Sequence, residues 1–111
     1  MTHVSTEEVI TALEEEDAQF AEVLGTESVT IEIGKYPTAS PKNPHNEDEV
    51  YYIVSGSGMI RVGDETYNVE TGDVVFVEQG FEHDFFNIDE EITALTIFLG
   101  SDDPSSYSIR E

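Results

Sequence analysis

The sequence has no cysteine and only four basic residues. The absence of cysteine excludes disulfides, thiolate nucleophiles and cysteine-based zinc sites. No apolar run is long enough to span a bilayer, and the chain does not open on a charged and then apolar signal segment. From these absences we expect a soluble, cytoplasmic protein.

The few basic residues are opposed by 25 acidic ones, which gives a formal net charge of −21. Such a chain repels phosphate backbones and anionic lipids, so we expect neither a nucleic-acid partner nor a membrane partner. The acidic residues are spread over the whole chain, as in proteins of halophilic microbes, and this distribution indicates adaptation to multimolar salt. The alternative interpretation is an acidic surface that docks a basic partner.

The length of 111 residues predicts one domain with a real hydrophobic core. Its first part has the pattern of an amphipathic helix. Ser5 or Thr6 can cap this helix, Glu8 lies in capping-box register with Ser5, and Gly25 is a plausible end. Residues 1–26 are therefore predicted to form a helical segment packed on the rest of the chain.

After this segment the apolar period changes to two, which is typical of strands. In the stretch SVTIEIGKY the apolar residues alternate at Val29, Ile31 and Ile33. Further short stretches of strand character follow up to residue 100, and they are EVYYIV, GMIRV, ETYNV, DVVFVE, HDFFNI and ITALTIFLG. About seven short strands predict an all-β antiparallel sandwich or barrel over residues 27–100.

Turn signals separate these stretches, and the GSG sequence at Gly56 to Gly58 has the composition of a hairpin turn. The other signals lie at 63–64, 71–73 and 87–90. Residues 101–111 are predicted to be a tail or an edge strand.

A metal site is indicated by the residues before and within the third strand stretch. If the chain is extended there, Asn43, His45, Glu49, Tyr51 and Ile53 share one face. In a small barrel this face looks inward.

His83 is the other histidine near the strands, and with Phe85 and Asn87 it forms a second such face. Two imidazoles and one carboxylate hold a divalent metal and leave coordination positions open for substrate or water. The alternative for each histidine is a solvated side chain among acidic neighbours.

Two blocks of this sequence resemble the motifs of the cupin superfamily. The first motif has two histidines one residue apart, a glutamate three or four residues later and a glycine after six more. Here Asn43-Pro44-His45 stands at the histidine pair, and Glu49 and Gly56 follow at the required spacing. The first histidine of the family is therefore an asparagine in this chain.

The second motif runs from a glycine through Pro-x-Gly to a histidine and an asparagine. Gly72, Gly80, His83 and Asn87 match every spacing, and only the proline is replaced, by Glu78. This resemblance implies a jelly-roll barrel, the double-stranded β-helix, with the amphipathic helix at its N-terminus.

By carry-over from the family, the metal ligands are His45, Glu49 and His83, with Asn43 as a weak or indirect fourth ligand. Glu47 is the alternative carboxylate if the register of the loop slips. The resemblance implies a divalent metal ion, and an amide oxygen in place of an imidazole favours Fe(II) or Mn(II), with Zn(II) or Ni(II) as alternatives.

The resemblance leaves the function open between two classes. One is a metal-dependent enzyme of the oxygenase or isomerase type that acts on a small molecule. The other is a non-catalytic barrel that binds or senses a small, sugar-like ligand. A homodimer paired through sheet edges is expected in either case.

Candidates for the substrate pocket are Tyr51, Arg61, Phe76 and Phe85. Aromatic side chains on strands are more often part of a core, and Arg61 has a surface ion pair as its alternative.

Overall fold

The computed structural model describes residues 3–15, 20–37 and 47–99. Asn43, His45 and the predicted tail at 101–111 lie outside the described residues. No helix in the described ranges is long and apolar enough to cross a membrane. The elements in chain order are α1 (Thr6–Glu15), β1 (Phe20–Gly25), β2 (Val29–Tyr36), β3 (Asp48–Val62), β4 (Glu65–Glu70), β5 (Val74–Val77) and β6 (His83–Leu99).

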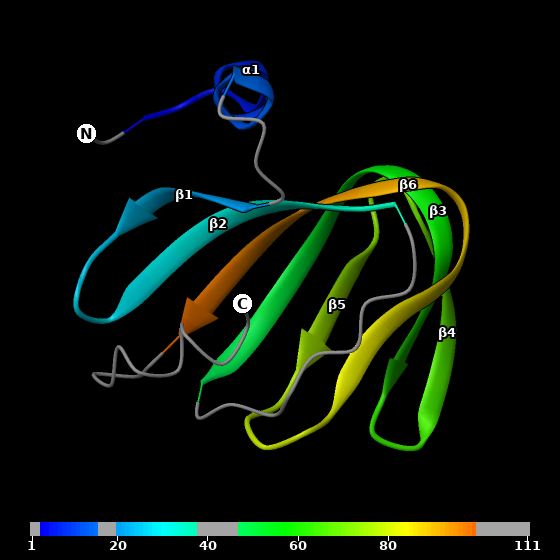
Figure 1. Cartoon of the computed structure of the whole chain (residues 1–111). Helices are drawn as coiled ribbons and strands as arrows, with labels where there is room; N and C mark the ends of the chain where they lie inside the picture. Colours follow the sequence, from blue (N-terminus) through cyan, green and yellow to red (C-terminus); the bar gives the residue numbers. More distant parts are fainter. Residues whose placement is uncertain (1–2, 16–19, 38–46, 100–111) are drawn as a thin grey trace.

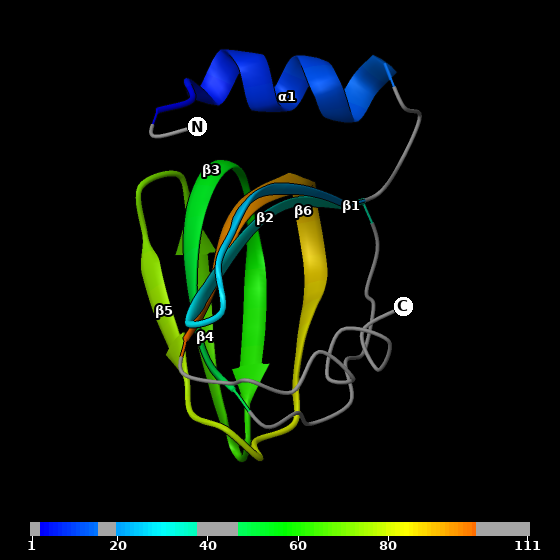
Figure 2. The ribbon, with the colours of Figure 1, turned by 90° about the vertical axis from the view of Figure 1, so that its left-hand side faces the viewer.

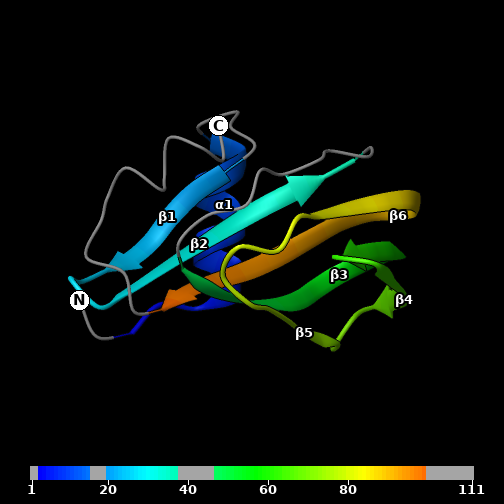
Figure 3. The same ribbon diagram turned by 90° about the horizontal axis from the view of Figure 1, so that it is seen from below.

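The strands form one antiparallel sheet in the order β1-β2-β6-β3-β4, and β5 pairs with β3 beside β4. Figure 1 shows β3 and β6 bending over, so that the sheet folds on itself around an interior. Figure 3 shows the same strands from below, with β5 and β4 on the side away from β1. The predicted all-β antiparallel barrel with an N-terminal helix is confirmed.

The N-terminal helix begins as predicted. The Ser5 Oγ accepts a hydrogen bond from the Glu8 N–H at 3.1 Å, and the Ser5 N–H donates to Glu8 Oε1 at 3.4 Å, which is a capping box. Figure 2 shows α1 lying across the outer face of β1, β2 and β6. Its buried residues Val9 and Leu13 pack there against Ile33.

The predicted extension of this helix to Gly25 is wrong, because α1 is described only to Glu15 and residues 20–25 form strand β1. Phe20 and Leu24 fit a helical stripe, but tertiary contacts decide otherwise. β1 pairs with β2, and the Phe20 ring packs edge-on against the Tyr36 ring, with 5.7 Å between the ring centroids. The sheet therefore begins before residue 27.

Two predicted turns are also wrong. The GSG sequence and residues 87–90 lie inside the continuous strands β3 and β6, which are 15 and 17 residues long. The unusual dihedrals that suggested turns serve to bend these strands, since Gly56 has φ 98° and Asn87 has φ 47°. The β3–β6 register also shifts three times between Ile53 and Met59. By contrast, residues 63–64 and 71–73 lie at real strand connections.

The two faces of β2 belong to different cores. Ile33 is buried under α1, and Val29 and Ile31 share its parity, so the predicted apolar face of this strand is the outer one. Thr30 and Tyr36 lie on the opposite, inner face. The interior core consists of Tyr36, Tyr51, Ile53, Ile60, Val69, Val77, Phe85, Ile92 and Ala94.

Candidate metal centre

Glu49 and His83 meet inside the barrel although they stand at opposite ends of the β3–β6 ladder. Glu49 pairs with Phe98 near one end, and His83 pairs with Val62 at the other. The bend in the two strands brings Glu49 Oε1 to 3.3 Å from His83 Nε2, and each residue is only 1% exposed. The structure thus brings together two of the three predicted ligands.

The other nitrogen of His83 faces a backbone acceptor. His83 Nδ1 lies 3.2 Å from the backbone carbonyl oxygen of Phe81, to which an Nδ1–H can donate. With the proton on Nδ1, the Nε2 of a neutral ring carries the lone pair that binds a metal. His83 Nε2 and Glu49 Oε1, 3.3 Å apart, are then bridged either by a proton or by a cation.

The distance between His83 Nε2 and Glu49 Oε1 fits two ligands of one divalent metal ion. Two ligands bound to one ion at the usual nitrogen and oxygen distances lie about 3.0–3.4 Å apart. The observed 3.3 Å lies in this range, and a carbonyl that orients the second ring nitrogen is the usual partner of a metal-binding histidine. Within the described ranges no group of three histidine, cysteine, aspartate or glutamate side chains could hold a metal ion. The third predicted ligand, His45, lies outside those ranges.

Glu47, the alternative carboxylate, is also buried. It lies two residues before Glu49 and has the same parity in an extended chain. The contact of 3.3 Å to His83 Nε2 is made by Glu49. The geometry therefore favours Glu49 over Glu47 as the partner of His83.

A row of hydrogen-bonded hydroxyl groups begins at Glu49. The Tyr51 side chain is hydrogen-bonded to Glu49 and to Tyr36, and Tyr36 is hydrogen-bonded in turn to Thr96. Burial raises the pKa of Tyr51 well above its usual value of 10.0, and the negative charge of Glu49 raises it further. Burial also raises the pKa of Tyr36, followed by the charges of Glu49 and Glu32.

Strand pairing explains why these groups meet. Thr96 on β6 lies directly opposite Tyr51 on β3, and opposite residues of an antiparallel pair face the same side. Tyr36 is at the end of β2, which flanks β6 on its other side. Tyr36 and Thr96 were not predicted as site residues, because a polar residue on a strand is a weak signal when the neighbouring strands are unknown.

Two of the predicted pocket residues lie in the interior. Tyr51 and Phe85 are both buried, and their ring centroids are 5.0 Å apart. Asn87 does not continue the inner face begun by His83 and Phe85. It is exposed, because the strand bends at its left-handed conformation.

The other two predicted pocket residues lie elsewhere. Arg61 alternates with the buried Ile60 and makes an ion pair of 2.7 Å with Asp84 through Nη2, so its guanidinium is engaged outside the barrel core. Phe76 alternates with the buried Val77 and is 56% exposed. It contributes to a pocket at the surface.

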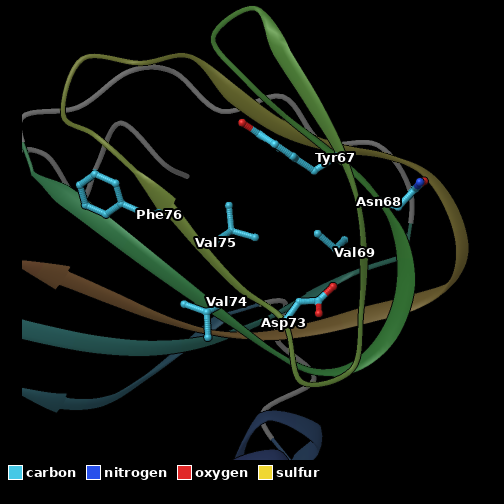
Figure 4. A pocket seen from close by; sticks show the side chains of 7 residues that line it. All are labelled: Tyr67, Asn68, Val69, Asp73, Val74, Val75 and Phe76. Carbon is cyan, nitrogen blue, oxygen red and sulfur yellow. The ribbon is translucent and has the colours of Figure 1, made fainter.

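This pocket lies between β4 and β5, and its lining side chains are shown in Figure 4. Its volume is about 310 Å³, and its lining residues are Tyr67, Asn68, Val69, Asp73, Val74, Val75 and Phe76. Val75 pairs with Tyr51, and Val69 belongs to the interior core. The floor of the pocket therefore borders the interior core, against which Val75 packs.

Comparison with protein families gives a match over residues 29–99 to the family described as cupin domain. A curated relative, the uncharacterized protein SCO3923 of Streptomyces coelicolor, is 44% identical over 61 residues. That match covers 55% of this chain and 58% of the relative, so this chain spans little more than half of the relative's length.

Solved structures share the fold. The plu4264 protein of Photorhabdus luminescens superposes with a TM-score of 0.65 and 26% identity, over 78% of this chain and 76% of that one. A predicted oxalate decarboxylase from Thermotoga maritima superposes with a TM-score of 0.63 and 22% identity, over 72% of this chain and 77% of that one. The second likeness concerns the fold alone.

Proposed function

Because this chain belongs to the cupin family, we propose that it binds one divalent metal ion through His45, Glu49 and His83 and acts there on a small molecule. The observation that carries the proposal is the approach of His83 Nε2 to Glu49 Oε1, 3.3 Å apart in a buried interior. Asn43 is proposed as a weaker or indirect ligand. Fe(II) or Mn(II) is the favoured ion.

A divalent ion at this position supplies a Lewis acid with open coordination positions for an oxygen-bearing small molecule. The protein supplies the remainder of the site. The Phe81 carbonyl oxygen orients the His83 ring, and Glu49 presents a carboxylate oxygen to it. Val69 and Val75 line the surface pocket and pack in or against the interior core.

The reaction is proposed to be of the oxygenase or isomerase type, with the pocket between β4 and β5 as the side from which the small molecule approaches. A second candidate is a barrel that binds a small, sugar-like ligand without turnover. It is favoured by Asn43, which replaces a histidine of the family motif. A screen of small-molecule libraries with the metal-loaded protein distinguishes the two candidates. Turnover is detected by oxygen uptake and by product analysis.

Metal content tests the proposal directly. We expect wild-type protein purified in high salt and passed over a chelating resin to retain about one Fe or Mn per chain. His83→Ala and the near-isosteric Glu49→Gln should each lose it. His3→Ala is the matched control, because His3 is an exposed histidine outside the barrel and its removal should leave the metal content unchanged. Equal metal in wild type, His83→Ala and Glu49→Gln would contradict the proposal.

We also propose a homodimer in the cytoplasm. It is supported by the sheet edge at β1, which among the described strands pairs with β2 alone. Light scattering in high salt should give twice the 12.3 kDa mass of one chain. A mass of one chain at micromolar concentration would rule the dimer out.

A further inference from the structure

Behind Glu49 lies a line of three hydroxyl groups that the metal ligands themselves do not require. Tyr51, Tyr36 and Thr96 come from β3, β2 and β6, and each is nearly fully buried. Burying a hydroxyl is unfavourable unless it is hydrogen-bonded. Apolar residues of similar size would fill the same space without this requirement. The presence of three buried hydroxyl groups therefore needs an explanation other than packing.

The direction of the hydrogen bond between Tyr51 and Glu49 follows from the groups involved. The hydroxyl of Tyr51 carries one proton, and a carboxylate only accepts. Tyr51 therefore donates to Glu49. Tyr51 is also hydrogen-bonded to Tyr36, and Tyr36 to Thr96.

Aromatic packing holds the Tyr51 ring in place. Its centroid lies 5.0 Å from that of Phe85, 6.0 Å from the imidazole of His83 and 6.5 Å from the ring of Tyr36. These separations are those of favourable edge-to-face and tilted contacts. The donor that reaches Glu49 is thus fixed by the same ring cluster that contacts the imidazole.

We propose that Tyr51 is a positioning residue that orients the Glu49 carboxylate toward His83 and thereby sets the affinity and selectivity of the metal site. The inference rests on the proposed function, because it concerns the same metal. A carboxylate held by a fixed donor keeps one orientation, whereas a carboxylate without that donor can rotate away from the imidazole. Loss of such a supporting hydrogen bond typically weakens metal binding about 10–100-fold.

The test is the dissociation constant for Mn(II) of the full-length chain in at least about 2 M KCl, where nonspecific binding to surface carboxylates is screened. Only the tight site that Glu49→Gln removes is counted. We expect Tyr51→Phe to raise this dissociation constant about 10–100-fold. The electron paramagnetic resonance spectrum of bound Mn(II) should also change its zero-field splitting, since the ligand geometry changes.

Tyr52→Phe is the matched control. Tyr52 is the next residue of β3 and also a tyrosine, but it faces outward and is 42% exposed. Its dissociation constant and spectrum should equal those of wild type. Melting in excess chelator compares the folding of the metal-free variants, so that a loss of affinity is not mistaken for a loss of structure.

The outcomes are distinguishable. A tight site in wild type that Tyr51→Phe leaves unchanged in affinity and spectrum overturns the inference and leaves the proposed function standing. A wild type without any tight site overturns the proposed function and the inference together. If Tyr51→Phe does not fold, Tyr36→Phe removes the hydroxyl to which the Tyr51 side chain is hydrogen-bonded. A weaker, measurable loss of affinity there supports the inference, and wild-type affinity overturns it.

Discussion

Replacing Gly56 with alanine is expected to lower the free energy of unfolding by more than about 4 kcal/mol, beyond the usual range for a single substitution. A Cβ at this position would lie 2.1 Å from the Glu91 carbonyl oxygen and 2.7 Å from the Ile92 Cα. Both atoms belong to the backbone of β6, which cannot move without disturbing the ladder. The φ of 98° adds strain for any residue with a side chain.

Gly72→Ala is the control for this substitution. Gly72 has nearly the same φ, 94°, but nothing lies within 4 Å of its added Cβ. This variant should lose only about 1–2 kcal/mol, the typical cost of a left-handed conformation. Urea unfolding of both variants separates the effect of close strand approach from the effect of the dihedral angle. Equal losses would show that β6 is not held tightly against Gly56.

The second large effect is expected from salt. Two like charges 10 Å apart repel by about 0.4 kcal/mol in water without salt, and this chain has a net charge of −21 with a radius of gyration of 13.2 Å. The Debye length falls from about 10 Å at 0.1 M to about 3 Å at 1 M. Raising KCl from 0.1 to 2 M should increase Tm by roughly 10 °C, or about 2 kcal/mol.

A charge-reduced variant tests whether repulsion is the cause. Changing six exposed glutamates to glutamine lowers the net charge from −21 to −15 without touching the core. The six positions are Glu27, Glu70, Glu78, Glu82, Glu90 and Glu91. Its Tm should be higher than that of wild type at 0.1 M KCl and should rise less with salt. The same salt slope in both proteins would attribute the effect to stronger apolar burial instead.

Local features of the fold could be predicted from the sequence where one short segment decides them. The Ser5–Glu8 capping box, the strand around Ile31 and the connection at Gly72 are of this kind. Gly56 and Asn87 were misread as turns, because a positive φ is common to a turn and to a bent strand. Only the partner strand distinguishes the two, and β6 lies far from Gly56 in the sequence.

For the candidate site, the inward direction of Glu49 and Tyr51 follows from strand parity, and the approach of His83 follows from the family resemblance. The line from Tyr51 to Thr96 could not be predicted. It depends on which strands are neighbours, and a threonine on a strand has no local signal that marks it as a buried donor.

The long β3–β6 ladder also has a consequence for how the protein folds. Its pairs join residues separated by 21 positions at Val62 and His83 and by 51 positions at Asp48 and Leu99. Contacts of such sequence separation form slowly, whereas the neighbouring β3–β4 hairpin is local and can form early. Glu49 and His83 meet only after the whole ladder has closed and bent. A metal bound by both residues, as proposed, would therefore encounter a completed barrel and would not serve as a nucleus for the early steps of folding.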